Sequence, residues 1–471
     1  MKKHNFSWKS LILALISGLL LGSAITFIFI SVKINNTQNA GGDLTEVSQV
    51  YQTIRKNYYR KVSSKTLVDG AINGMIKSLN DPYSEYLTDK DQTDFNSSIT
   101  GKISGIGATI EKDNDSIKIV SVMPKSPAAK NDLKPKDLIK KINNKSTKSM
   151  TVSEASSLTK GKEGTKVTLT IQRGTDIFQK ELTREPIKVS TVYSKLDKNN
   201  HAIGYITITQ FSDHTASELK KNVKSLKKKG AKKLIVDVRN NPGGVMDQAI
   251  SASSMFVKNG RKIMTITSKK DGSKTYYANK KYQNDYKVNM PTVVLVDGGT
   301  ASAAEIFSGA LNQSAGIPLI GEKTFGKGVV QTLSPLTADS EMKITTAKWL
   351  TPNGSWINKK GIKPTIEVKY PAYMSIKPFK ETKTLAVGAT DGDVKIAQQM
   401  LTGLGLKTNQ TGVLDAATSN NLKKFQAAHK LSVTGNLDKQ TRVVLIQELA
   451  KKARSNDTMY NKAISVLNGE K

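Results

Sequence analysis

The stretch 202–320 constrains the fold most, because apolar strands and helices alternate along it. Strands are expected at 202–209, 234–238, 292–296 and 317–320, and helices at 214–229, 246–256 and 303–312. This alternation is typical of an α/β fold, in which a mainly parallel sheet carries helices on both faces. The loops after Val238, Val296 and Ile320 should then meet at the carboxyl edge of the sheet, where functional groups of such folds gather.

Two of these loops carry a serine and a lysine that could act together. Ser302 lies between a predicted strand and a helix, and Lys327 follows the last strand. The chain has only 4 histidines, so a serine hydrolase could use lysine as its base if burial or a nearby cation lowers the lysine pKa. Gln331 would share a strand face with Lys327 and could orient the amine. Ser302 as a simple helix cap and Lys327 as a surface lysine are the alternatives.

Backbone donors for a developing oxyanion lie nearby in the sequence. Ala303 opens the predicted helix after Ser302, and Gly243 and Gly244 follow the neighbouring strand. Backbone N–H groups placed in this way commonly supply the largest single contribution to catalysis by acyl-transfer enzymes. The residues alone leave open which of the two glycines donates.

A phosphate-binding loop is the nearest rival interpretation of the lysine segment. The stretch 321–327 fits the spacing G-x-x-x-x-G-K. The next position should be Ser or Thr to hold magnesium, but it is Gly328, and Val329 and Val330 favour a strand where a helix should begin. The segment is therefore not expected to bind a nucleotide.

The N-terminal segment predicts a membrane anchor. Residues 11–32 are apolar and uncharged, and Lys2, Lys3 and Lys9 precede them. At 1.5 Å per residue they would span about 33 Å, enough for a bilayer core. A cleaved signal peptide, which usually has a shorter apolar region, is the alternative. We expect 1–10 in the cytoplasm and the rest of the chain outside, at the cell membrane as a single-pass protein.

Composition narrows the chemistry further. The chain has no cysteine, which excludes disulfides, thiolate catalysis and cysteine-based metal sites. Lys and Arg number 72 against 39 Asp and Glu, giving a net charge of +33. This charge either keeps the surface soluble or attracts anionic lipids and wall polymers. Nucleic acid is not an expected partner, because the basic residues are scattered and most of the chain lies outside the cell.

The regions on either side of the α/β stretch have different sequence patterns. Residues 33–98 form a linker and a helical region, with helical periodicity at 44–59 and 67–79. Residues 99–186 contain short strands and Gly/Pro turns. After a linker at 371–385, helices are expected at 394–404, 421–429 and 441–450, and 405–418 and 431–441 follow one repeated scheme. Residues 451–471 remain as a C-terminal tail.

The segment 99–186 resembles a PDZ domain. The resemblance rests on the glycine loop Gly105-Ile106-Gly107, the helix start Ser126-Pro127 and the stretch 133–139. It implies that an extended peptide is held as an added strand, with its terminal carboxylate on the backbone of the glycine loop. A β-rich spacer without a ligand is the alternative.

The segment 386–450 is similar to the peptidoglycan-binding domain of wall hydrolases. The shared pattern comprises Leu401, Gly405, Gly412, Asp415, Thr418, Leu422, Phe425, Gln426, Gly435, Asp438 and Thr441. A helical dimerisation module is the alternative, since spacing alone does not name the ligand.

The segment 187–370 resembles the core of the carboxyl-terminal processing, or tail-specific, proteases. The matching stretches are 237–244, 301–306, 325–328 and Gln331. The order of anchor, helical arm, PDZ domain, core and wall-binding domain is similar to that of Gram-positive members. The one departure is Thr300, where the family usually has serine.

The resemblance implies a role for each matching residue. Ser302 would be the nucleophile, Lys327 the general base and Gln331 its orienting partner. Gly244 and Ala303 would form the oxyanion hole, with Gly243 as the alternative donor.

These features together predict a membrane-anchored serine endopeptidase without a metal or cofactor. Its partners would be protein substrates recognised through their C-terminal tails, the peptidoglycan and the membrane, and a homodimer is left open. A catalytically silent PDZ scaffold between membrane and wall is the alternative from another class. A muralytic hydrolase is a third option, but the core lacks the paired carboxylates or histidine metal site of such enzymes.

Overall fold

The computed structural model describes residues 44–88, 91–92, 95, 99–337 and 340–470. The apolar run 11–32, predicted as a membrane anchor, lies outside these residues. Among the described helices, none combines the length and the apolar character needed to cross a bilayer. The chain divides into two compact units, of which the first combines the N-terminal arm with residues 334–336 and 341–344.

The first unit contains the helices expected from the periodicity at 44–59 and 67–79. These are α2 (Thr45–Asn57) and α3 (Ser64–Lys77), and the strand β1 (Glu85–Thr88) begins in the same unit. Ser63 caps α3 by accepting a hydrogen bond from the Thr66 N–H at 3.0 Å. Glu85 forms an ion pair with Lys343.

The second unit is built around a six-stranded sheet. Its strand order is β10 (Val192–Leu196), β11 (Ile203–Ile208), β12 (Lys233–Asp237), β15 (Thr292–Val296), β16 (Leu319–Gly321) and β19 (Ile366–Glu367). The pairings from β11 to β19 are parallel, whereas β10 runs antiparallel to β11. The turn between β10 and β11 is too short for a crossover, and this forces the antiparallel edge.

A second sheet of this fold is antiparallel, which corrects the expectation of a mainly parallel core. Its strands include β13 (Lys262–Ser268), β14 (Gly272–Tyr277), β17 (Val329–Thr337) and β18 (Ser340–Leu350). The core is therefore mixed. The pairings of β13 with β14 and of β13 with β18 are both antiparallel.

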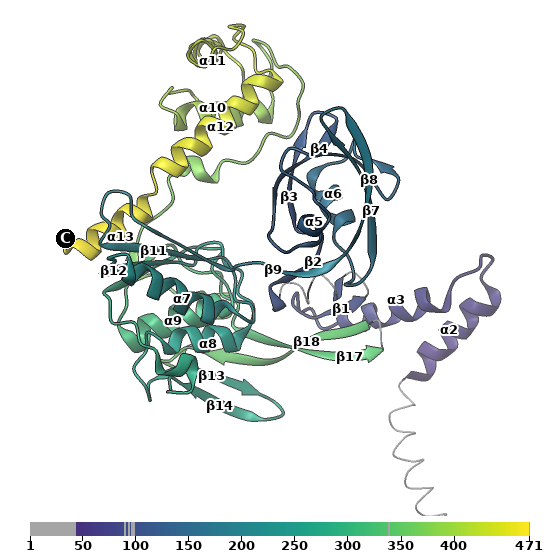
Figure 1. Ribbon diagram of the computed structural model, residues 1–471, viewed down its shortest axis with the longest axis vertical. Coiled ribbons are helices and arrows are strands. Elements are labelled where there is room, and N and C mark those ends of the chain that lie inside the picture. Colours follow the sequence, from purple (N-terminus) through teal and green to yellow (C-terminus); the bar gives the residue numbers. More distant parts are fainter. Residues whose placement is uncertain (1–43, 89–90, 93–94, 96–98, 338–339, 471) are drawn as a thin grey trace, which may run out of the picture. The chain divides into compact units, whose positions relative to one another are not determined.

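Helices cover both faces of the six-stranded sheet (Figure 1). On one face α7 (Thr215–Lys228), α8 (Met246–Ser254) and α9 (Ala303–Ala315) pack on buried side chains such as Val236 and Val294. On the other face α13 (Thr458–Asn468) buries Met459 and Ala463 against side chains such as Ile235 and Val293. Adjacent strand residues thus face opposite helical layers. The segment 451–471, expected only as a tail, supplies α13.

The predicted PDZ segment forms an antiparallel sheet with two helices. Its elements are β2 (Lys102–Gly105), β3 (Ala108–Asp113), β4 (Ser116–Val122), α5 (Pro127–Lys130), β5 (Leu138–Ile142), β6 (Lys145–Ser146), α6 (Val152–Thr159), β7 (Lys166–Arg173), β8 (Asp176–Thr183) and β9 (Glu185–Lys188). Ile117, Ile139 and Leu169 belong to its buried core. The strand β3 lies at the edge of the sheet order β3-β4-β5-β7-β8, and β2 pairs with β9.

The repeat predicted near the C-terminus is visible in its hydrogen bonds. The segment contains the helices α10 (Gly392–Gly403), α11 (Ala416–Ala428) and α12 (Lys439–Ser455). Two short 3₁₀ helices lie outside it: η2 (Tyr282–Asp285) in the protease core and η3 (Ala372–Ser375) in the linker. The Gln398 amide donates to Thr418 Oγ1 at 3.0 Å, and Gln426 donates to Thr441 Oγ1 at the same distance. Gly412 N–H donates to Gln398 Oε1 at 2.9 Å, and Gly435 N–H repeats this bond with Gln426.

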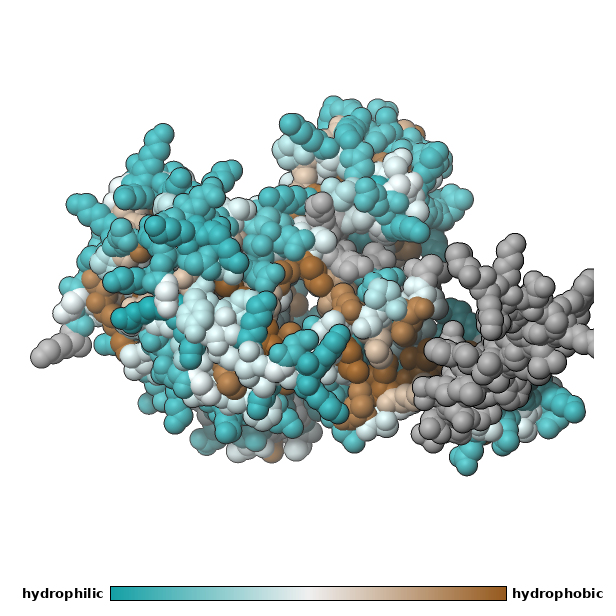
Figure 2. Space-filling view, turned by 90° about the horizontal axis from the view of Figure 1, so that it is seen from below, coloured by the Kyte–Doolittle hydropathy of each residue, from teal (hydrophilic) through white to brown (hydrophobic). Residues whose placement is uncertain are grey.

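The surface agrees with the lysine-rich composition. Figure 2 shows a largely hydrophilic face with smaller hydrophobic patches between the polar side chains.

Candidate active site

Ser302 lies at the sharp turn between β15 and α9. Its backbone has φ 53° and ψ −116°, a conformation that costs a non-glycine residue free energy and is common at functional sites. The turn before it is held by Asp297, whose Oδ1 accepts hydrogen bonds from the Asn240 and Gly299 N–H groups at 2.9 Å each. Ser302 is half-buried at the start of the helix. Folding the turn therefore fixes the position of the serine.

Gly243, one of the two glycines predicted as an oxyanion-hole donor, lies directly beside Ser302. A Cβ atom on Gly243 would be 2.7 Å from Ser302 Cβ and 2.9 Å from Ala303 N, so only glycine allows this approach. The Gly243 N–H donates to Asn241 Oδ1 at 2.9 Å. Because this N–H is already engaged, the geometry favours Gly244 as the donor with Ala303.

Lys327 is brought to Ser302 by a shared acceptor, the buried Glu305. Glu305 Oε2 accepts hydrogen bonds from the Ser302 N–H at 2.9 Å and from the Lys327 N–H at 2.8 Å. Glu305 Oε1 accepts from the Gly326 N–H at 2.8 Å and from Thr324 Oγ1 at 2.5 Å. The carboxylate therefore joins the loop after β15 to the loop after β16.

Glu305 is fully buried in α9, and its burial raises the pKa of the carboxyl above its usual value. Its hydrogen bonds to Thr324 and to three backbone N–H groups act in the opposite direction by stabilising the ionised form. Sequence analysis gave Glu305 no role. The spacing Ser-x-x-Glu of Ser302 and Glu305 is the pattern of a capping box, and this signal could have identified it.

Gln331 occupies β17 next to the Lys327 loop. Its amide donates to Thr345 Oγ1 on β18 at 3.1 Å. The Lys327 carbonyl accepts a hydrogen bond from Trp349 Nε1 at 2.9 Å, so both residues are tied to the same strand. The contact by which Gln331 would orient the lysine amine stays a prediction.

The turn 211–215 is hydrogen-bonded to the loop 243–245, which is called the oxyanion loop here because it carries the predicted oxyanion-hole glycines. The Phe211 N–H donates to Gly243 O at 2.7 Å, and the Val245 N–H donates to Phe211 O at 2.8 Å. A Cβ on Gly244 would lie 2.0 Å from Phe211 O, where Gly244 has φ +127°. This loop therefore requires glycine at 244, and two backbone hydrogen bonds hold it to Phe211.

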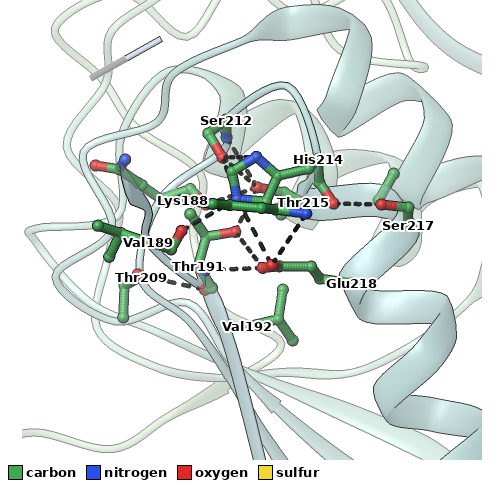
Figure 3. A network of polar contacts seen from close by, with 12 residues as sticks. Lys188, Val189, Thr191, Val192, Thr209, Ser212, His214, Thr215, Ser217 and Glu218 are labelled. Carbon is green, nitrogen blue, oxygen red and sulfur yellow. Dashed lines mark hydrogen bonds and ion pairs between the residues drawn. The ribbon is translucent and has the colours of Figure 1, made fainter. Parts of the chain in front are cut away.

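The same turn holds the chain segment that returns from β9 to the core (Figure 3). His214 Nε2 lies 3.1 Å from Val189 O, and Glu218 Oε2 accepts from the Thr191 N–H at 2.8 Å. The hydroxyls of Thr191 and Thr215 are 2.7 Å apart. A continuous set of hydrogen bonds therefore connects the end of the PDZ segment to the turn behind Gly243.

The predicted carboxylate loop Gly105-Ile106-Gly107 joins β2 to the edge strand β3. Ile106 is buried, and its carbonyl accepts from the Ala128 N–H at 2.7 Å. Gly107 has φ +76°, and a Cβ there would lie 2.2 Å from Ser126 Cβ. The loop conformation is thus fixed by glycine and by the start of α5.

Four known families each match a part of the chain. Residues 202–368 match peptidase family S41, and residues 29–92 match the N-terminal domain of the activating protease CtpB. Residues 96–172 match the PDZ domain, and residues 390–445 match a putative peptidoglycan binding domain.

Similarity to curated relatives extends over almost the whole chain. The carboxy-terminal processing protease CtpA of Bacillus subtilis (strain 168) is 46% identical over 426 residues, which are 90% of each chain. A probable CtpA-like serine protease of Staphylococcus aureus (strain bovine RF122 / ET3-1) is 39% identical over 470 residues, which are 98% of this chain and 93% of that protein.

Among solved structures, the photosystem II D1 C-terminal processing protease is similar to this chain with 26% sequence identity and a TM-score of 0.41. The similar region covers 68% of this chain and 86% of the chain of that protease. The identities over whole chains decide the assignment. This chain belongs to peptidase family S41, as a serine peptidase of the carboxy-terminal processing type with a PDZ domain and a peptidoglycan-binding domain.

Proposed function

We propose that this protein is a membrane-anchored endopeptidase outside the cell, with Ser302 as nucleophile and Lys327 as general base. The observation that carries this proposal is the single Glu305 oxygen that accepts hydrogen bonds from both the Ser302 and the Lys327 N–H groups. A shared acceptor keeps the two loops in register, as a proton transfer between their side chains requires.

The catalytic cycle follows from these roles. The neutral Lys327 amine takes the Ser302 proton while Oγ attacks the scissile carbonyl carbon, and the N–H groups of Gly244 and Ala303 stabilise the resulting oxyanion. The lysine ammonium then returns the proton to the leaving amine. Water, deprotonated by the same lysine, hydrolyses the acyl-enzyme, while Gln331 keeps the amine oriented.

The PDZ domain would deliver the substrate and control access to the site. Its edge strand β3 offers unpaired backbone groups to an extended peptide, and the 105–107 loop lies at the end of that strand. The hydrogen bonds from Val189 and Thr191 to the 211–215 turn supply a route from the PDZ segment to Gly243. Capture of a C-terminal tail would act on the oxyanion loop through this route.

The N-terminal apolar run and the peptidoglycan-binding domain would place the enzyme between membrane and wall. The apolar run 11–32 is long enough to span a bilayer, and the peptidoglycan-binding domain would hold the wall. The net charge of +33 favours both anionic surfaces. Resistance of the membrane-bound protein to carbonate extraction tests the anchor, and its release by carbonate would contradict it.

Cleavage of an unstructured protein such as casein tests the catalytic assignment. Ser302→Ala and Lys327→Ala should each abolish cleavage. The matched controls are Ser308→Ala on the same helix and Lys323→Ala on the same loop, and both should stay active. Casein cleavage by Ser302→Ala at the wild-type rate would refute the proposed nucleophile.

A further inference from the structure

The helix α13 follows the peptidoglycan-binding domain in sequence but packs on the protease sheet. Met459 and Ala463 are fully buried against Ile235, Val293 and Leu295. The sulfur of Met459 lies 3.1 Å from where a Cβ on Gly321 would sit, just before the Lys327 loop. The protease core is therefore completed by residues at the far end of the chain.

The N-cap residue of this helix, Asp457, binds a buried arginine of the core. Asp457 caps α13 by accepting from the Tyr460 N–H at 3.0 Å. Its two carboxylate oxygens also accept from Arg239 Nη1 at 2.8 Å and Nη2 at 2.7 Å. Such a two-point pair fixes the orientation of the guanidinium plane as well as its position. The Arg239 side chain is only 10% exposed.

Arg239 is also held by Asp237, the last residue of the strand β12 that precedes it. Asp237 accepts from Arg239 Nε at 3.0 Å and from Nη2 at 2.7 Å, and Asp237 in turn accepts from the Tyr205 hydroxyl. The guanidinium thus lies between two carboxylates. Loss of Asp457 would leave Nη1 without this acceptor in a site with little access to water, which favours reorientation of the arginine.

Reorientation of Arg239 would reach the oxyanion hole through a short, tightly bonded loop. The next residue, Asn240, has φ +53° and donates its N–H to Asp297 at 2.9 Å. Asn241 donates its side-chain amide to Ile208 O at 2.8 Å and accepts from the Ala301 N–H at 2.9 Å. Gly243 then packs on Ser302. The segment from Arg239 to Gly243, which contacts Ser302, is short, so it can absorb little of a shift in the position of the arginine.

We propose that Asp457 is a positioning residue for the protease, which holds Arg239 and thereby sets the Gly243–Gly244 turn against Ser302. The inference rests on the proposed function, because it takes Gly244 as an oxyanion donor. It makes the chain beyond the wall-binding domain a requirement for full catalytic rate. The Asp457 contact should act on kcat, since it sets donors for the transition state and touches no substrate.

The test compares full-length variants on one tail-bearing peptide substrate. Asp457→Asn and Asp457→Ser keep a side chain that can cap α13 but remove the ion pair with Arg239. Each should lower kcat about tenfold or more with KM within about twofold, because a small misplacement of catalytic groups is costly. Asp457→Glu should recover part of the loss, since its carboxylate can still reach Arg239.

The matched control is Tyr460→Phe, which removes another polar contact between α13 and the core. The Tyr460 hydroxyl donates to Asp197, beside β10 and outside the oxyanion loop. This variant should keep the wild-type kcat. The proposal is overturned if the Asp457 variants keep wild-type kcat, or if Tyr460→Phe loses as much activity as they do.

Melting temperatures separate misplacement from unfolding. If Asp457→Asn and Asp457→Ser unfold while Asp457→Glu restores neither stability nor kcat, Asp457 acts only as a structural residue and the proposal fails. Retained cleavage by Ser302→Ala would instead refute the catalytic assignment itself. The two failures therefore give different results.

Discussion

Ser302 and Lys327 donate their backbone N–H groups to one oxygen of a buried glutamate, although they come from loops after different strands. The two loops are thus held together by one side chain, Glu305, and by a direct backbone hydrogen bond from the Phe325 N–H to Thr300 O at 3.0 Å. A serine–lysine site is usually described by its two reactive side chains. In this protein the buried Glu305 carboxylate also determines how the loops that carry them meet.

Replacement of Glu305 by glutamine should uncouple these loops. The glutamine amide has one oxygen and an NH₂ group, so it cannot accept all four hydrogen bonds that the carboxylate accepts. We expect kcat/KM to fall about 100-fold and stability to fall by about 1–3 kcal/mol. Steady-state kinetics and calorimetry measure both. Glu367→Gln, an exposed carboxylate on β19, is the control and should change neither.

The pH dependence of cleavage should report a lysine base. Lys327 accepts the serine proton only as a neutral amine, so kcat/KM should rise toward alkaline pH. Lys323→Ala, on the same loop but exposed, should keep this profile. A rise centred at about pH 6.5, the ordinary range of histidine, would count against the assignment.

Gly244→Ala should damage the site more than Gly298→Ala. A Cβ at 244 would meet Phe211 O at 2.0 Å with φ +127°, whereas a Cβ at 298, on the turn before Ser302, meets no described atom within 4 Å. We expect Gly244→Ala to lose activity and about 2 kcal/mol or more of stability. Equal melting temperatures for the two variants would show that the Gly244 turn can relax.

The Asp457–Arg239 pair should make stability depend on acid pH. Burial raises the Asp457 pKa, but the hydrogen bonds and charge of Arg239 outweigh this and lower it overall. A lowered pKa in the folded state gives stability above the unfolded value of about 3.9, and this stability is lost as pH falls through the folded value. Asp457→Asn should therefore melt several degrees below wild type at pH 7, and the gap should narrow as the pH falls below the unfolded pKa of Asp.

The exposed carboxylate Asp271, on the β13–β14 turn, supplies the control for this measurement. Asp271→Asn should follow the wild-type melting curve at every pH. A gap between Asp457→Asn and wild type that stays constant from pH 7 to pH 3 would mean that the ion pair is not its source.

The sequence was sufficient for features that depend on local pattern. Alternating apolar runs predicted β11, β12, β15 and β16, and their carboxyl ends do meet at the loops of Ser302 and Lys327. The helical periods in the N-terminal arm and the repeated scheme of 405–418 and 431–441 were visible for the same reason.

Other features depend on contacts between distant residues and left no local trace. Asp457 and Arg239 are 218 residues apart in the chain, and neither the spacing nor the composition of 451–471 marks a contact with the core. The antiparallel edge β10 arises from how the chain returns after β9. Glu305 is an intermediate case. Its capping-box spacing to Ser302 is visible in the sequence, whereas its hydrogen bonds from Thr324, Gly326 and Lys327 leave no local pattern.

The position of α13 also means that the protease is discontinuous in sequence, with the wall-binding module looped out between two of its elements. The two ends of that loop already touch, since Thr458 Oγ1 donates to Lys369 O at 3.3 Å. The module is thus an insertion rather than an appendage. Removing it cleanly means joining the chain near residue 370 to residue 456 by a short linker, whereas cutting the chain at the module's start would also strip a helix from the catalytic sheet.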